Sequence, residues 1–156
     1  MTIPSGRRIL VLGYGNPGRQ DDGLGPMAAT RINDLGWPYL TGFENYQLNI
    51  EDAIDVAAHD IVWFIDASKT EPSPFAVRAL KPSPAIEFTS HILRPEALLA
   101  IAHQCYGKAP EAYMLAIRGY AFEFIESLTP GATLNLNAAL AMLTTRISTL
   151  HGGEAP

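Results

Sequence analysis

Four ionisable side chains stand at points of the sequence where an α/β protein would carry its chemistry. Asp21 and Asp22 close a glycine-rich segment, Asp66 directly follows the apolar run 61–65, and His91 lies in a later loop. In open α/β sheets, ligands and reacting groups gather beyond the carboxyl ends of the strands. Carboxylate and imidazole groups are common ligands of divalent cations. These residues are therefore the candidate site, and cation binding is the chemistry that they favour.

The glycine-rich segment, residues 13–26, reads GYGNPGRQDDGLGP. Gly13, Gly15 and Gly18 satisfy the G-x-G-x-x-G spacing of dinucleotide-binding turns. Such a turn leaves a helix N-terminus free for a pyrophosphate, whose charge the backbone N–H groups and the helix dipole stabilise. Here two aspartates stand where the helix begins, and their carboxylates would repel a phosphate. The segment thus favours a bound cation or a self-capped helix over nucleotide binding.

The opening of the same segment, residues 13–18, also resembles the peptidyl-tRNA hydrolases, which share a related α/β fold. That family continues with an Arg-His-Asn stretch that carries its catalytic histidine, and this sequence has no such stretch. The formal net charge of −5 is also unfavourable for binding tRNA. A peptidyl-tRNA hydrolase-like enzyme is the alternative enzyme hypothesis.

The whole of residues 13–26 resembles the nickel–iron hydrogenase maturation proteases, whose pattern is Gly-x-Gly-Asn-x-x-x-x-Asp-Asp-Gly-x-Gly-Pro. Later features of that family are matched in the same order by residues 64–67 (FIDA), 89–91 (TSH), 119–123 (GYAFE) and 128–130 (LTP). The resemblance runs from residue 9 to about residue 130, which is most of the chain.

The resemblance implies that Asp22, Asp66 and His91 bind a metal and take part in peptide-bond hydrolysis. The metal that it implies is nickel supplied by the substrate, and another divalent ion can substitute in the isolated protein. The implied reaction removes the C-terminal extension from the nickel-loaded precursor of a hydrogenase large subunit, which is the expected partner. The sequence leaves open whether a metal-bound or a carboxylate-activated water attacks.

Five further residues are expected to shape the loop or contact the substrate: Gly15, Asn16, Asp21, Gly25 and Glu123. The two glycines would permit special backbone conformations or a close approach. Asn16 would anchor the loop, and Asp21 would cap the helix or support its neighbour.

Each proposed ligand also has an ordinary structural explanation. Asp22 alone is typical of a helix cap, Asp66 of a turn and His91 of a loop histidine, and only their ordered joint occurrence favours a metal site. A chaperone that checks for nickel without cutting would use the same three residues, so it remains a hypothesis of a different class. Residues 46–51 replace a Gly-Thr-containing turn of many family members, and the segment 123–128 is short. Which hydrogenase is processed therefore stays open.

The elements that must position these residues follow from apolar periodicity. Strands are expected at residues 9–12, 43–48, 61–65, 75–80 and 113–117, the fourth of them antiparallel or at an edge. Four helices are expected. The first has Pro26 in its first turn and an apolar stripe of Leu24, Ala28, Ile32 and Leu35; the second covers 49–58 with Asn49 as its cap. The third covers 95–106, and the fourth carries an apolar stripe of Leu136, Leu140, Leu143, Ile147 and Leu150. This alternation predicts a single-domain, three-layer α/β sandwich with a mostly parallel twisted sheet and helices on both faces.

The bulk composition is that of one globular domain over residues 1–156, with 47% hydrophobic and 17% charged residues. No apolar run approaches the roughly 18 residues that span a bilayer, and the first eight residues do not resemble a signal peptide. The lone Cys105 excludes an internal disulfide, suits a reducing cytosol and is expected to be a buried core thiol. We expect a cytoplasmic monomer that binds neither nucleic acid nor membrane.

Overall fold

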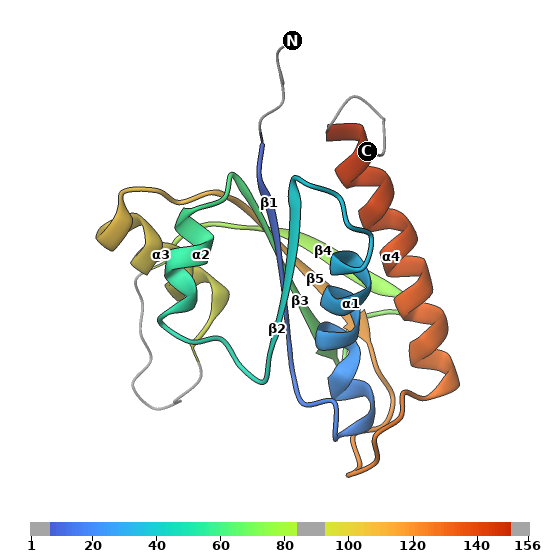
Figure 1. The fold of residues 1–156 in the computed structure, drawn as a ribbon. Helices are drawn as coiled ribbons and strands as arrows, with labels where there is room; N and C mark the ends of the chain where they lie inside the picture. The colour runs from blue at the N-terminus through green and yellow to red at the C-terminus, as the bar shows by residue number, and fades with distance from the viewer. Residues whose placement is uncertain (1–6, 84–92, 151–156) are drawn as a thin grey trace.

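Five strands of the computed structural model form one sheet in the order β2-β1-β3-β5-β4 (Figure 1). The structure describes residues 7–83 and 93–150. The strands are β1 (Ile9–Tyr14), β2 (Leu40–Asn45), β3 (Ile61–Ser68), β4 (Phe75–Leu80) and β5 (Glu111–Arg118). Neighbouring strands are parallel except for β4, which lies antiparallel to β5 at one edge. The expected mostly parallel sheet is confirmed.

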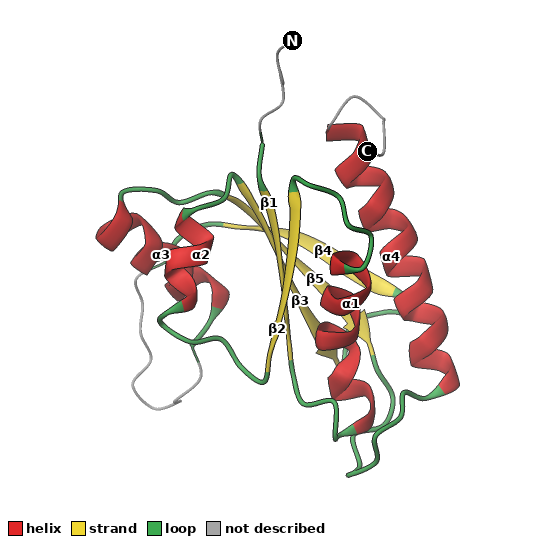
Figure 2. Cartoon of the chain, viewed as in Figure 1, coloured by secondary structure: helices red, strands yellow, loops and turns green. Residues whose placement is uncertain are grey.

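Helices cover both faces of this sheet (Figure 2). Helices α1 (Leu24–Asn33) and α4 (Pro130–Leu150) lie on one face, and α2 (Asp52–Ala57) and α3 (Pro95–Tyr106) lie on the other. A short 3-10 turn, η1 (Gln20–Gly23), leads from the glycine-rich loop into α1. The three-layer α/β sandwich is therefore confirmed, and none of the helices in the described ranges is long and apolar enough to cross a membrane.

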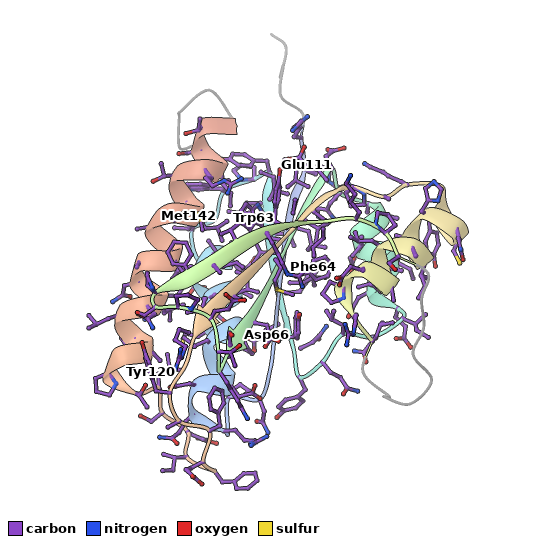
Figure 3. All side chains as sticks on the ribbon, turned by 180° about the vertical axis from the view of Figure 1, so that it is seen from behind. Trp63, Phe64, Asp66, Glu111, Tyr120 and Met142 are labelled. Carbon is purple, nitrogen blue, oxygen red and sulfur yellow. The ribbon has the colours of Figure 1, made fainter. Side chains whose placement is uncertain are left out.

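The central strands are continuous apolar runs because each of them is buried on both sides. In β1, Ile9 and Val11 belong to the core beneath α1 and α4, whereas Leu10 and Leu12 belong to the core beneath α2 and α3. The same alternation in β3 sends Trp63 and Phe64 into opposite layers (Figure 3). The parity of a residue within its strand thus decides which layer its side chain enters.

Two expected elements on the chain between β1 and β3 have different bounds in the structure. The second strand covers Leu40–Asn45 rather than 43–48, because it pairs with β1 from Leu40 onward. Leu48 is buried as an anchor of the following turn and not as part of a strand. The expected cap by Asn49 is wrong: the helix starts at Asp52, whose own carboxylate accepts a hydrogen bond from the Asn49 backbone N–H at 2.8 Å.

Two residues expected in the core are exposed. Cys105 is exposed because the last turn of α3, residues 103–106, extends past the layer that buries the first part of the helix. Leu35 is 40% exposed because α1 already ends at Asn33, while the other three members of its predicted stripe are buried.

Candidate functional site

Asp22 and Asp66 come from different elements and face the same edge of the sheet. Asp22 lies in η1, directly after the loop that leaves β1, and Asp66 lies near the carboxyl end of β3. Figure 3 shows Asp66 at the end of the sheet opposite Glu111, the residue that begins β5. The two aspartates therefore lie where open α/β sheets hold their ligands, as the sequence predicts.

Asp22 stabilises the glycine-rich loop through one of its carboxylate oxygens. Its Oδ2 accepts a hydrogen bond from the Asn16 backbone N–H at 2.7 Å, and the Asn16 Oδ1 accepts one from the Gly18 N–H at 2.8 Å. A backbone donor that a dinucleotide fingerprint would offer to a phosphate is therefore occupied by the chain's own carboxylate. No hydrogen bond from another described residue engages the second oxygen, Oδ1.

Two glycines let the backbone pass close enough to form this loop. Gly15 has a φ of +142°, and a Cβ there would lie 2.1 Å from the Asp22 carbonyl oxygen. At Gly25 a Cβ would lie 2.4 Å from the Tyr14 carbonyl oxygen and 2.5 Å from that of Ile65. A side chain at Gly15 would push η1 away from the end of β1, and one at Gly25 would push the start of α1 away from the ends of β1 and β3.

Asp66 is a half-buried carboxyl with an unusual proton affinity. Burial raises its pKa to about 7, a hydrogen bond from the Ala67 N–H to Oδ1 at 2.8 Å opposes this rise, and the negative charge of Asp22 adds to it. The contribution of Asp22 indicates that its carboxylate lies within electrostatic reach of Asp66. Two oxygens, Asp22 Oδ1 and Asp66 Oδ2, are left for a ligand by the described residues, which is a donor set that fits a divalent cation.

The third candidate ligand, His91, lies outside the described residues. Within residues 7–83 and 93–150, no three His, Cys, Asp or Glu side chains gather closely enough to form a metal site. The described part of the site is thus a pair of carboxylates, and the histidine stays a prediction.

Asp21 has a different role from its neighbour, and the capping role considered for it is not what the structure shows. Its fully buried carboxylate accepts hydrogen bonds from the backbone N–H groups of Tyr120, Ala121 and Thr129 and from the Thr129 hydroxyl, at 2.7 to 3.1 Å. Burial alone would raise the pKa of Asp21, but these hydrogen bonds outweigh it and hold the pKa below its usual range. Asp21 therefore fastens the turn that bears Asp22 to the segment between β5 and α4.

Further contacts join the same two segments. The Gln20 N–H donates to the Ile125 carbonyl oxygen at 2.8 Å, and the Gln20 Oε1 accepts from the Glu123 N–H at 2.9 Å. Arg19 donates to the Phe122 carbonyl oxygen and lies over the Phe124 ring. Glu123, expected to contact the substrate or shape the loop, thus meets η1 through its backbone, and its side chain is exposed.

Tyr14 is a residue of this site that the sequence analysis did not select. Burial raises the pKa of its phenol strongly, and the negative charges of Asp66 and Glu96 add to this effect, whereas Arg78 opposes it. The signal was available in the sequence: Tyr14 follows Leu10 and Leu12 with the strand period of two, so its side chain enters the same layer at the end of β1.

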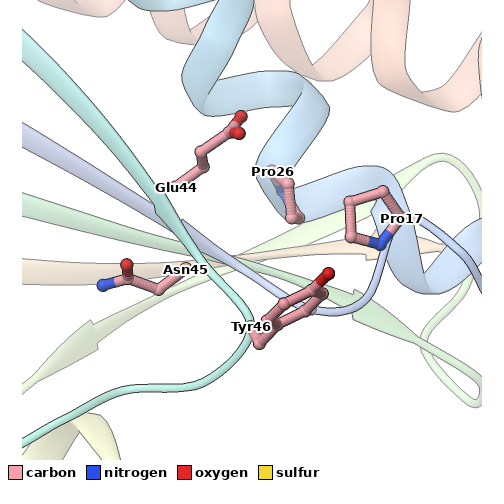
Figure 4. Close-up of a pocket in the computed structure, with 6 residues that line it drawn as sticks. Pro17, Pro26, Glu44, Asn45 and Tyr46 are labelled. Atoms are coloured by element: carbon pink, nitrogen blue, oxygen red, sulfur yellow. The ribbon is translucent and has the colours of Figure 1, made fainter.

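A cavity of about 280 Å³ opens beside the glycine-rich loop, between that loop and the end of β2 (Figure 4). Its walls are formed by Gly15, Pro17, Pro26, Glu44, Asn45 and Tyr46. Tyr46 is 74% exposed at this rim. An open cavity with both apolar and acidic walls therefore adjoins the loop that leads to Asp22.

Comparisons with known proteins agree on the fold. No protein-family model and no curated protein matches the sequence. The NiFe hydrogenase maturation protease HycI from Thermococcus kodakarensis is similar with a TM-score of 0.69 and 19% identity, over 90% of this chain and 93% of that one. A hydrogenase 2 maturation peptidase from a Thaumarchaeota archaeon gives 0.67 and 20%, over 91% and 99%. The hydrogenase maturating endopeptidase HybD from E. coli gives 0.65 and 20%, over 90% and 93%. The resemblance to the maturation proteases is confirmed at the level of the fold.

Proposed function

We propose that this chain is an endopeptidase that removes the C-terminal extension from the nickel-loaded precursor of a nickel–iron hydrogenase large subunit. The observation that carries the proposal is the pairing of Asp22 and Asp66, two half-buried carboxylates at the carboxyl end of the sheet. Each has an oxygen that no hydrogen bond from the described residues engages. Solved structures of the same fold are named as hydrogenase maturation proteases.

In this proposal Asp22, Asp66 and His91 bind the nickel that the precursor already carries. Oxygen and nitrogen ligands suit a divalent transition metal, and three protein ligands leave positions for the precursor's own groups. The close negative charge of Asp22 opposes ionisation of Asp66 in the metal-free protein. A cation between them would remove this repulsion, so recognition of loaded precursor would be favoured over precursor without nickel.

The remaining site residues would position the precursor. Gly15 and Gly25 permit the close packing of the Asp22 turn and the start of α1 against the ends of β1 and β3, and Asp21 fastens that turn to the segment before α4. The cavity beside Gly15 has room for a side chain of the extension, with Tyr46 at its rim. Since the metal is bound to the precursor, we propose that the reaction takes place in the cytoplasm, where the precursor would be loaded.

The experiment is incubation of the protein with nickel-loaded and with nickel-free precursor, followed by size-exclusion chromatography and intact-mass measurement. The proposal predicts that only the loaded precursor loses a short C-terminal peptide. A nickel-checking chaperone would instead form a complex with the loaded precursor and leave its mass unchanged. Cleavage of both forms would refute recognition of nickel.

A further inference from the structure

Tyr14 and Asp66 lie side by side at the end of the sheet. β1 and β3 are parallel, and Gly13 pairs with Ile65 in the last pair of their register. Tyr14 and Asp66 are the next residues of the two strands, which neighbour each other at roughly 4.8 Å. The phenol and the carboxyl therefore start from adjacent backbone positions.

Both side chains also project from the same face of the sheet. The residues two and four positions before Tyr14 are Leu12 and Leu10, and all of these residues contact the core layer beneath α2 and α3. The corresponding residues before Asp66, Phe64 and Val62, belong to that same layer. The period of two thus places the phenol beside the carboxyl rather than across the sheet from it.

A phenol is protonated at neutral pH, and charged groups from three elements lie around the phenol of Tyr14. Tyr14 is half-buried, and charged groups of β3, α3 and β4 act on its hydroxyl: Asp66, Glu96 and Arg78. Arg78 and Glu96 are paired with each other at 3.5 Å. No hydrogen bond to another described residue uses this hydroxyl, so its O–H group is available to donate to a bound molecule.

Peptide hydrolysis is accelerated by such a donor. When the oxygen of water bonds to the carbonyl carbon, the electron pair of the C=O bond moves to the carbonyl oxygen and gives it a negative charge. The oxyanion's electron pair then re-forms the C=O bond while the C–N bond breaks with its electron pair on nitrogen, and the leaving amine takes up a proton derived from the water. Carboxylates cannot stabilise the charged oxygen, whereas a positioned O–H group can.

We propose that the Tyr14 hydroxyl donates a hydrogen bond to the carbonyl oxygen of the scissile peptide bond and to the oxyanion that forms from it. Tyr14 keeps its own proton throughout, so it is a catalytic residue without being an acid or a base. This inference rests on the proposed endopeptidase function and adds a residue to its site.

The test replaces Tyr14 by Phe, which removes only the hydroxyl. Tyr113→Phe is the matched control, because Tyr113 lies on β5 in the opposite core layer and donates to the exposed Glu111. We would measure kcat and KM for nickel-loaded precursor, the affinity for Ni²⁺ by calorimetry, and the melting temperature. Tyr14→Phe should lower kcat by about 100-fold, the loss typical of one oxyanion donor, with KM and Ni²⁺ affinity changed by no more than about twofold. The control should behave like the parent.

Other outcomes would overturn the inference. An unchanged kcat in Tyr14→Phe would exclude contact with the oxyanion. A fall in Ni²⁺ affinity by the same factor as kcat would mean that the hydroxyl supports Asp66 instead. A clear fall in the melting temperature relative to Tyr113→Phe would mean that it supports the fold. A parent protein that leaves the loaded precursor intact would refute the proposed function itself, and the role of Tyr14 with it, whereas cleavage by the parent and by Tyr14→Phe at equal rates would refute the role of Tyr14 alone.

Discussion

Asp21 and Thr129 are joined by two hydrogen bonds across 108 positions of the chain. The Thr129 N–H donates to Oδ1 of Asp21 and the Thr129 hydroxyl donates to Oδ2, both at 2.8 Å. Asp21 is fully buried, and the next residue, Asp22, belongs to the proposed metal site. This pair of residues therefore connects the stability of the fold with the position of a proposed ligand.

Removal of the Asp21 carboxylate should strongly destabilise the protein. Asp21→Ala leaves four part-buried donors without their acceptor. Each buried unsatisfied group costs about 1–3 kcal/mol, so we expect a loss of about 3 kcal/mol in the free energy of unfolding. Thr129→Val removes one donor to Asp21 and the acceptor of the Ala132 N–H, and it should cost about 1–2 kcal/mol. The matched control is Thr144→Val, whose hydroxyl bonds only within α4 and should change little. Urea unfolding measures all three, and a tolerated Asp21→Ala would contradict the role given to this residue.

Acid should remove the stabilisation that Asp21 provides. The folded-state pKa lies below the unfolded value of about 3.9, so the contribution is fully present above about pH 4 and is lost as the pH falls through the lower folded-state value. The difference in unfolding free energy between the parent and Asp21→Asn should be constant from about pH 5 to pH 8 and shrink below about pH 4. Urea unfolding over this pH series is the measurement, and a difference that grows in acid would have the wrong sign.

Asp66 should have the opposite effect on stability. Its folded-state pKa of about 7 lies above the unfolded value, so the folded protein binds the extra proton and loses stability as the pH rises from about 4 to about 7. Asp66→Asn cannot ionise and should be more stable than the parent by about 1–3 kcal/mol above pH 7, with the gain shrinking toward pH 4. Asp60, whose pKa is lowered by Lys108, is the control, because Asp60→Asn should give no gain at high pH. Thermal unfolding of the parent and both variants at pH 5 and pH 8 shows whether each substitution raises or lowers stability. A lack of any gain for Asp66→Asn at pH 8 would contradict the prediction.

The closeness of the two site carboxylates can be measured directly. Asp22→Asn removes one negative charge, so it should lower the pKa of Asp66, while burial keeps that pKa above its usual range. The amide retains an acceptor for the Asn16 N–H, so the loop should be preserved. NMR titration of the Asp66 carboxyl carbon gives the pKa, with Asp60→Asn as a distant control. An Asp66 pKa that is the same in Asp22→Asn and in the parent would mean that the two carboxylates are too far apart to interact, and it would contradict the proposed metal site.

Local patterns predicted the elements that position the site. The runs in β1 and β3 are apolar because both of their faces are covered, and the edge strand β4 was placed correctly by its flanking prolines. The glycine-rich motif led to Asp22, and the end of an apolar run led to Asp66. Cys105 was misplaced because helical periodicity does not show where the adjacent layer ends.

Contacts between distant segments could not be predicted in this way. The donors that surround Asp21 come from residues 120–129, about one hundred positions later, so its neighbours in the sequence gave no sign of burial. Tyr14 needed the register of β1 against β3 as well as its own parity. His91 lies outside the described residues and remains a prediction from the sequence.

The most direct measurement is the intact mass of nickel-loaded large-subunit precursor after incubation with the parent protein and with Asp22→Ala, Asp66→Ala and His91→Ala. Asp60→Ala, which alters a carboxylate paired with Lys108 away from the site, serves as the control variant. The account predicts loss of a short C-terminal peptide with the parent and the control and an unchanged precursor with the three site variants, provided that each variant is folded by circular dichroism. Equal cleavage by folded Asp22→Ala or Asp66→Ala, or an uncut precursor with the parent, would contradict it.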